Sequence, residues 1–152
     1  MRKLVFGAAA ALAMIAAPAA FAADCPASKV GVDVMKPGPM MPKKVTDKVI
    51  SSIDLKSYDI DGRQMRLRRL VVQPGGIVPW HSHEKRPANI YVVSGQITEY
   101  RSTCAVPILH TAGDVTAESG NLSHWWKNNS KHVTVLLSAD ILPPEEKPAA
   151  TM

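Results

Sequence analysis

Short segments of alternating polar and apolar residues, separated by turn signals, limit the folds open to this chain more than any other feature. From Val45 onward these segments follow one another closely, and none repeats its apolar residues with the period of an amphipathic helix. The segments are VISSIDLKSY, RQMRLRRLVV, ANIYVV, QITEYR, VTAES, LSHWWKN and KHVTVLLSADI, and the turns between them include Asp61-Gly62, Pro74-Gly75-Gly76, Ser94-Gly95, Ala112-Gly113-Asp114 and Asn128-Asn129-Ser130. This pattern predicts an all-β fold, a single small antiparallel β-barrel or jelly roll over residues 45–140.

The first 22 residues differ in composition from the predicted barrel. Arg2 and Lys3 precede an apolar run, and Ala20-Phe21-Ala22 forms a small-x-small cleavage site. The apolar run is shorter than the ~20 residues that cross a bilayer, so we interpret residues 1–22 as a signal peptide rather than a membrane anchor. We therefore expect a periplasmic or secreted protein with no membrane attachment after cleavage.

Two further segments lack a regular pattern. Residues 23–44 contain four prolines and two glycines, which predict an irregular arm whose apolar side chains pack on the domain. Residues 141–152 are rich in proline, alanine and charged residues and predict a disordered tail.

The net charge argues against a nucleic-acid partner. The formal charge is +5, and the basic residues do not form one long run. Their densest group is RQMRLRRL, with Arg63, Arg66, Arg68 and Arg69. We interpret this group as the solvated face of a strand, and the alternative is that one arginine points inward and meets an anionic ligand.

The chain has two cysteines, Cys25 and Cys104. An even number in an exported protein favours a disulfide, here one that ties the arm to a mid-chain loop. Closing a loop of about 80 residues stabilises the fold by roughly 4 kcal/mol in the chain-entropy description. Two free, reactive thiols are the alternative.

The histidines indicate chemistry. In PWHSHEKRPANIYVVSG, residues 79–95, His81 and His83 are two positions apart and so share one face of a strand. By the same rule His124 shares a face with Trp126 and Asn128. If both faces line one barrel, three imidazoles converge and suit Zn, Cu, Fe or Ni rather than Ca or Mg. The alternative is a set of inward polar side chains that bond to their neighbours.

The remaining histidines, His110 and His132, do not belong to this pattern. A single histidine in a strand is usually an ordinary core or surface residue, and we interpret both in that way.

The spacings resemble two motifs of the cupin superfamily. Gly75, His81, His83 and Gly95 match the first motif, and Gly113, His124 and Asn128 match the second. Ser119 and Asn121 stand where the second motif has a proline and a glycine. The resemblance covers about residues 45–140. It implies a cupin barrel, a metal ion held by three histidines and a glutamate, and activities that include dioxygenases and isomerases.

One expected ligand is missing, because the glutamate position of the first motif falls on Ala88. Either a water takes the place of the carboxylate, or the pocket binds no metal. Glu84 could fold back as a substitute ligand, although it should point outward beside His83. A protein exported unfolded takes its ion where it folds, so we expect zinc, copper or nickel rather than iron or manganese.

The predicted pocket is largely apolar. Along ANIYVV one face holds Ala88, Ile90 and Val92, and with Trp126 and Asn128 these residues would line the pocket. Trp80 and Trp125 should face outward, either at a homodimer interface or against the arm.

Three functions stay open. The first is a metal-dependent enzyme that acts on a small organic molecule, with no general base identified because Glu84, Glu99 and Glu118 are unplaced. The second is a non-catalytic protein that binds a metal or a small ligand on the same barrel. The third is a purely structural role with no ion bound.

Overall fold

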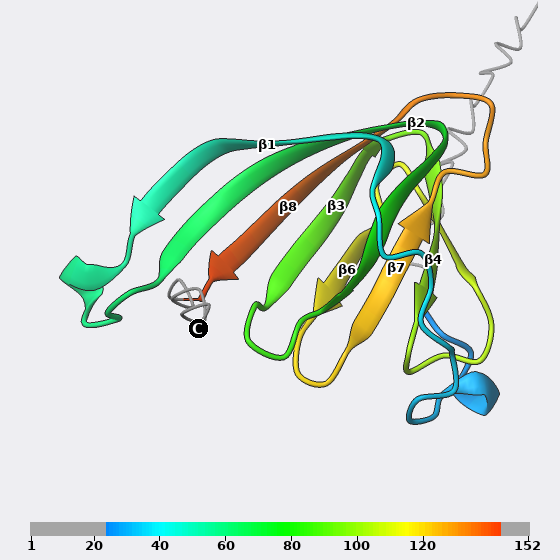
Figure 1. The fold of residues 1–152 in the computed structure, drawn as a ribbon, viewed down its shortest axis with the longest axis horizontal. Coiled ribbons are helices and arrows are strands. Elements are labelled where there is room, and N and C mark those ends of the chain that lie inside the picture. The colour runs from blue at the N-terminus through cyan, green and yellow to red at the C-terminus, as the bar shows by residue number, and fades with distance from the viewer. Residues whose placement is uncertain (1–23, 144–152) are drawn as a thin grey trace, which may run out of the picture.

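The structure, a computed structural model, describes residues 24–143 (Figure 1). The predicted signal peptide, residues 1–22, lies outside the described residues, and so does most of the predicted tail, from residue 144 onward. Within residues 24–143 no helix is long and apolar enough to cross a membrane.

The described part of the chain consists almost entirely of strands, which confirms the prediction of an all-β fold. The strands are β1 Lys43–Asp54, β2 Gln64–Ser82, β3 Ala88–Ser94, β4 Gln96–Arg101, β5 Ile108–Thr111, β6 Val115–Glu118, β7 Ser123–Lys127 and β8 Thr134–Leu142. Two short 3₁₀ helices, η1 Ala27–Lys29 and η2 Lys56–Tyr58, lie before β1 and between β1 and β2.

The strands form one antiparallel sheet that curls around a concave inner face. Its order is β5-β4-β7-β2-β8-β3-β6, and β1 pairs with β2 outside this path. Figure 1 shows β1 and the first half of β2 running together along the top, with β8, β3 and β6 fanning out below them. The first half of β2 pairs with β8 and its second half pairs with β7, so β2 joins the two sides of the curl.

The prediction that the segment of β2 ends at Pro74-Gly75-Gly76 is wrong, because the strand continues to Ser82. Asn128 supplies the backbone hydrogen bonds at this point of β2. The Gly75 N–H donates to Asn128 O at 2.9 Å, and the Asn128 N–H donates to Gly76 O at 3.0 Å. Gly75 has φ +72°, a conformation that glycine adopts at no steric cost. A side chain at Gly76 would lie 2.7 Å from Gln73 O, so only glycine fits there.

Strand β5 is also absent from the predicted segments, which pass directly from QITEYR to the turn at Ala112-Gly113-Asp114. It has four residues and pairs along its whole length with β4. A run this short carries too little alternation to be recognised in the sequence.

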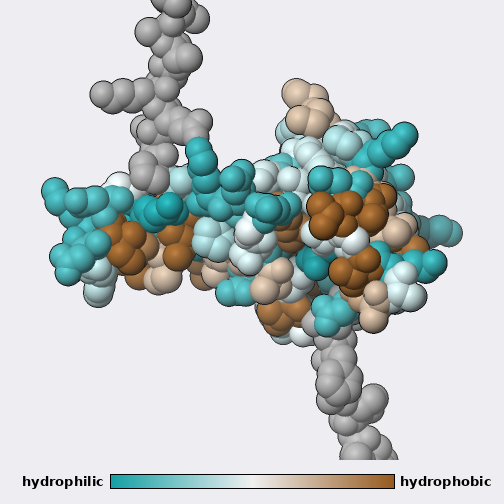
Figure 2. Space-filling view, turned by 90° about the horizontal axis from the view of Figure 1, so that it is seen from below, coloured by the Kyte–Doolittle hydropathy of each residue, from teal (hydrophilic) through white to brown (hydrophobic). Residues whose placement is uncertain are grey.

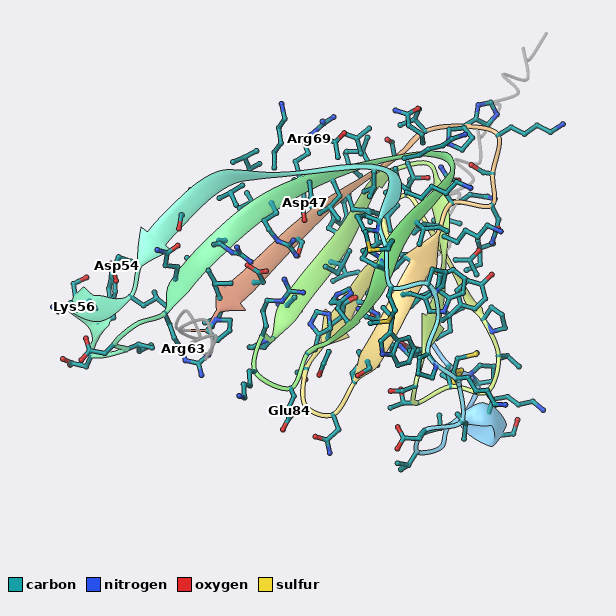
Figure 3. All side chains as sticks on the ribbon, in the orientation of Figure 1. Asp47, Asp54, Lys56, Arg63, Arg69 and Glu84 are labelled. Atoms are coloured by element: carbon teal, nitrogen blue, oxygen red, sulfur yellow. A yellow bond between two sulfur atoms is a disulfide. The ribbon has the colours of Figure 1, made fainter. Side chains whose placement is uncertain are left out.

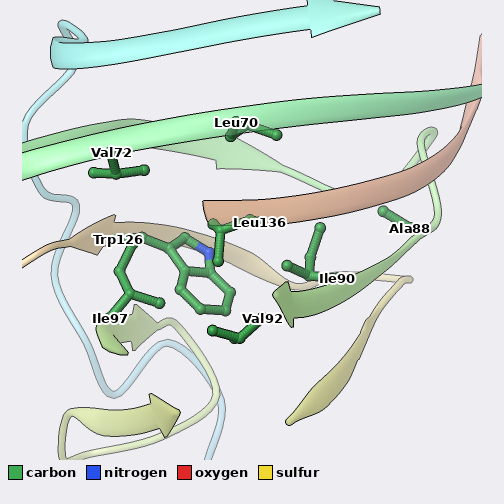
Figure 4. Packing of buried hydrophobic residues seen from close by; sticks show 8 residues of the cluster. All are labelled: Leu70, Val72, Ala88, Ile90, Val92, Ile97, Trp126 and Leu136. Atoms are coloured by element: carbon green, nitrogen blue, oxygen red, sulfur yellow. The ribbon is translucent and has the colours of Figure 1, made fainter. Parts of the chain in front are cut away.

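A hydrophobic cluster covers part of the inner face of the sheet (Figure 4). Its buried members come from β2, β3, β4, β7 and β8: Leu70, Val72, Ala88, Ile90, Val92, Ile97, Trp126 and Leu136. Outside the cluster, hydrophobic residues occur in separate groups among hydrophilic ones on the face in Figure 2.

The N-terminal arm is attached to the sheet at two places. A disulfide joins Cys25 to Cys104, which confirms that prediction, and Gly31 N–H donates to Thr103 O at 3.1 Å beside it. Further along, Trp80 N–H donates to Pro39 O at 2.8 Å, and the backbone at Gly38 lies against the Trp125 ring. Trp80 and Trp125 were expected either at a homodimer interface or against the arm, and in the structure both contact the arm.

Candidate metal centre

Three histidine rings meet on the inner face of the sheet. His81 on β2 and His124 on β7 are direct cross-strand partners, which places their side chains next to each other. His83 directly follows β2, and its N–H donates to Leu122 O at 2.8 Å. Its Nε2 lies 3.0 Å from Nε2 of His81 and 2.9 Å from Nε2 of His124. The expected convergence of His81, His83 and His124 is thus present.

Each ring is held by a hydrogen bond from its other nitrogen. Nδ1 of His81 lies 2.8 Å from Pro79 O, Nδ1 of His83 lies 2.8 Å from Arg86 O, and Nδ1 of His124 lies 2.6 Å from Glu99 Oε1. Carbonyl and carboxylate oxygens only accept, so each Nδ1 carries the hydrogen. At His124 the 2.6 Å contact with the Glu99 carboxylate decides this over the longer, 3.1 Å approach of Trp126 Nε1 to the same nitrogen. In a neutral ring Nε2 then bears a lone pair, and three lone pairs face one another.

Burial keeps these rings neutral. Loss of solvation, followed by repulsion from His124, lowers the pKa of His81 to about 4 and that of His83 to about 3. Burial also lowers the pKa of His124, and this effect outweighs the hydrogen bond to Glu99. Neutral imidazoles with inward lone pairs are the form of histidine that binds metal ions.

A carboxylate completes the group, and it belongs to Glu118. His81, His83, His124 and Glu118 each offer one ligand atom, and these atoms lie within 4.8 Å of one another. Glu118 Oε2 lies 3.0 Å from Nε2 of His83, and its Oε1 lies 3.5 Å from Nε2 of His124. The side chain is 1% exposed, and Oε1 has no hydrogen-bond partner.

Glu118 occupies the space that the missing motif glutamate would need. It is the cross-strand partner of Ala88, the residue at the glutamate position, so the two side chains lie side by side on the inner face. The small side chain of Ala88 leaves room for a carboxylate that enters from β6 instead of β3. Burial, followed by repulsion from Glu99, raises the pKa of Glu118 well above its usual value.

Glu84, named as a substitute ligand, does not take this place. It is exposed on the loop after β2, and Figure 3 shows its side chain pointing away from the sheet. Its backbone N–H donates to Ser82 Oγ at 3.2 Å, which holds the loop in this direction. The carboxylate of the group is therefore Glu118 and not Glu84.

Glu99 lies behind His124 and was not identified from the sequence. It is fully buried and accepts hydrogen bonds from Nδ1 of His124, from Nε2 of His110 at 2.9 Å and from Nε of Arg101 at 2.9 Å. Burial opposes its ionisation, but the bonds from His110 and His124 outweigh this effect and hold the pKa of Glu99 below its usual value. His110 is accordingly a core residue, as expected, whereas His132 is exposed.

The predicted pocket residues do not all line one pocket. Ile90 and Trp126 line a cavity of about 20 Å³ together with His81 and Glu118. Ala88 lies at an adjoining cleft, and Val92 lies within the hydrophobic cluster. Asn128 donates to Val72 O at 2.9 Å and to His132 O at 2.8 Å, so its amide holds a loop.

The arginines of RQMRLRRL lie on both faces of β2. Arg66 and Arg68 point toward the inner face, where both meet Asp140. Arg69 is exposed on the opposite face (Figure 3), and Arg63 is half-buried with Nη1 3.2 Å from Lys85 O. The interpretation as one solvated face is wrong for Arg66 and Arg68.

The sequence was compared with models of known protein families. Residues 68–140 match the model of the cupin domain. The protein contains a cupin domain. No curated protein matches the sequence.

Solved structures share this cupin's fold at low sequence identity. One is a predicted oxalate decarboxylase from Thermotoga maritima, with 19% identity and a TM-score of 0.54 over 74% of this chain and 97% of that chain. A second is the cupin domain of Cnp3 from Schizosaccharomyces pombe, with 10% identity and a TM-score of 0.53 over 66% of each chain. A third is the cupin domain of an XRE family transcriptional regulator from Enterobacter cloacae, with 13% identity and a TM-score of 0.51 over 68% and 100%. Their descriptions differ widely, so the shared fold alone does not indicate an activity.

Proposed function

We propose that this cupin binds one divalent transition-metal ion on His81, His83, His124 and Glu118 and acts on a small organic molecule at that ion. The observation that carries the proposal is the orientation of the rings: three Nε2 lone pairs point at one spot while each Nδ1 donates outward. Such outward bonds fix the ring and its tautomer in metal-binding histidines.

The donor set fits an ion in two further respects. Ligands bound to one zinc ion at ~2.0–2.1 Å cannot lie more than about 4.2 Å apart. The Nε2 separations of 2.9 and 3.0 Å meet this limit, whereas the outermost atoms of the group, up to 4.8 Å apart, would have to move closer around an ion. Glu118 Oε1 is buried without a hydrogen-bond partner, and a cation would satisfy it. A bound ion would supply Lewis-acid polarisation of a substrate oxygen or activation of oxygen.

We further propose export, and with it zinc, copper or nickel as the ion. The disulfide between Cys25 and Cys104 supports an oxidising compartment. In such a compartment the affinity order of divalent ions favours copper and zinc over iron and manganese. Elemental analysis of untagged protein isolated from its native compartment tests this choice, and stoichiometric iron would refute it.

Metal removal is the direct test of the site. A ligand at 100 times its dissociation constant stabilises the native state by about 2.7 kcal/mol, so a chelator should lower the melting temperature by several degrees. His124→Ala should remove this chelator effect, because one of the four ligands is lost.

His132→Ala is the matched control, because His132 is an exposed histidine of the same chain. It should keep the full chelator effect. Equal responses of the wild type and His124→Ala to the chelator would contradict the proposal.

A second candidate, a non-catalytic metal or ligand carrier, has its own support. The cavity beside the histidines measures about 20 Å³, which is room for about one water molecule. A carrier needs no more space than its ion and a single small ligand. Turnover of a panel of small organic substrates by the metal-loaded protein separates the two, since a carrier binds without converting.

A further inference from the structure

A line of charged side chains crosses the inner face beside the candidate metal centre. Arg66 on β2 pairs with Asp140 on β8, Asp140 pairs with Ala88 on β3, and Ala88 pairs with Glu118 on β6. Side chains at directly paired positions lie on one face of a sheet. Arg66 and Asp140 therefore stand in the same row as the carboxylate of the metal centre.

Three arginines gather around Asp140, which is 2% exposed. Arg66 donates to both its carboxylate oxygens, at 2.9 Å from Nε and 2.8 Å from Nη2. Nε of Arg68 lies 3.2 Å from Oδ2, and Nη1 of Arg86 lies 3.7 Å from the same oxygen. Arg66 thus bonds to both oxygens of Asp140, and the guanidinium groups of Arg68 and Arg86 lie beside this carboxylate.

Positive charge exceeds negative charge at this cluster. Asp47 bonds to Arg68 as a second carboxylate, so three guanidinium groups face two carboxylates. Arg68 contacts Asp47 through Nη1 and Ser138 through Nη2, and its buried Nε faces Asp140 at 3.2 Å without a hydrogen bond. Arg86 Nη1 is beyond hydrogen-bond distance of Asp140. A divalent ion on the three histidines and Glu118 would add further positive charge.

Arg68 connects this cluster to the candidate metal centre. It lines the same cavity of about 20 Å³ as His81 and Glu118. The cavity admits a group of about the size of one water, such as a single oxygen of a planar carboxylate. A guanidinium N–H can donate a charge-assisted hydrogen bond to such an oxygen, while the second carboxylate oxygen stays outside the cavity.

We propose that Arg68 and Arg86 bind the carboxylate of a small organic acid at the edge of the metal centre. The substrate class of the proposed function would then be small carboxylates. That the ligand reaches a bound ion rests on the proposed function. That its carboxylate pairs with Arg68 and Arg86 does not depend on the ion.

Calorimetric titration of malonate into Arg86→Gln tests the proposal. This substitution should preserve the fold, because the contact of Arg86 with His83 runs through its backbone carbonyl. Loss of one charged hydrogen-bond donor should weaken malonate binding about tenfold or more. Arg69→Gln is the matched control: it changes the same residue type on the outer face and should bind like the wild type.

Two readouts separate failure of this inference from failure of the proposed metal site. Metal content, measured first, decides the metal site for the wild type and both variants. Malonate titrated at constant ionic strength into metal-loaded and metal-depleted protein then decides the arginine site. Binding weakened in Arg86→Gln alone supports the inference in either form of the protein.

Absence of malonate binding to the wild type overturns the inference, and so does equal binding to Arg86→Gln and Arg69→Gln. Inorganic phosphate serves as the competing anion. If phosphate binds and malonate does not, the carboxylate assignment is overturned.

Discussion

The inner face of the sheet contains two regions of opposite character on the same strands. Around Leu70, Leu136 and Val92, which form one row across β2, β8 and β3, every neighbouring side chain of the cluster is apolar. Four residues along β2, about 13 Å away, the row of Arg66 and Asp140 leads to Glu118 and is charged. We call these the apolar region and the charged region.

The difference shows where the fold is stabilised and where it is adapted for binding. Burial of apolar side chains stabilises the native state by about 25 cal/mol per Å². Burial of charges costs solvation energy that pairing often does no more than offset, so a buried ion pair is weak evidence for stability. Buried charges beside a cluster of histidines therefore indicate a function rather than a structural need.

Breaking the charged region should give the largest loss of stability. Asp140→Asn removes the charge that neutralises Arg66, which is bound to both carboxylate oxygens, and leaves three guanidinium groups without it. Removing one partner of a buried ion pair costs about 3–5 kcal/mol. Denaturant unfolding of the metal-free protein measures this loss.

Asp47→Asn is the control for that experiment. Asp47 also bonds to an arginine of the group, Arg68, but its side chain is 40% exposed. Exposed ion pairs contribute about 0–1 kcal/mol, so this variant should unfold close to the wild type. Similar losses in both variants would show that Asp140 does not act as a buried counter-ion.

Breaking the apolar region should reduce stability and leave the metal site intact. Leu136 is 2% exposed, and Leu136→Ala should cost about 2–5 kcal/mol through lost burial and a residual cavity. Metal content per folded molecule should stay at the wild-type value, because Leu136 is not one of the four ligand residues. Denaturant unfolding measures the loss of stability, and elemental analysis of the folded variant measures its metal content.

Val93→Ala gives the reference for Leu136→Ala. Val93 follows the buried Val92 on β3 but is 43% exposed, so its truncation should change stability by less than about 0.5 kcal/mol. A loss of metal in Leu136→Ala, with the protein still folded, would mean that the two regions are not independent.

The parts of this structure that the sequence predicts are those that follow from the alternation of side chains along a strand. It places His81 and His83 on one face and His124 on a matching one, and the three rings meet. It also separates Arg66 and Arg68 from Arg69, but it cannot tell which face is inward. That choice depends on Asp140, which is 74 residues away from Arg66 in the chain.

Glu118 shows what alternation leaves out. Its strand, VTAES, is expected from the sequence, but the role of Glu118 follows from its pairing with Ala88 across β3 and β6. No tight turn joins β3 to β6, so residue spacing within either strand does not reveal their register, and a ligand moved to the neighbouring strand leaves no spacing motif. The passage of β2 through Gly75 and Gly76 was missed for the same reason, since Asn128 supplies the bonds.

The smallest expected effect concerns Glu99, which accepts a hydrogen bond from His124 behind the candidate metal centre. Glu99→Gln keeps the size of the side chain but replaces the carboxylate that orients His124 at 2.6 Å. Loss of such an orienting partner lowers metal affinity about 10–100-fold, equivalent to roughly 1.4–2.7 kcal/mol. Competition with a chromophoric chelator measures the dissociation constant.

Glu84→Gln makes the same chemical change at an exposed glutamate next to His83 and should leave the dissociation constant unchanged. The comparison isolates the orienting bond, because both variants lose one negative charge near the histidines. A merely structural role of Glu99 would lower the unfolding free energy of the metal-free protein without changing metal affinity. A tenfold or greater loss of affinity in Glu99→Gln alone would show that the carboxylate acts on the ion through the orientation and basicity of His124.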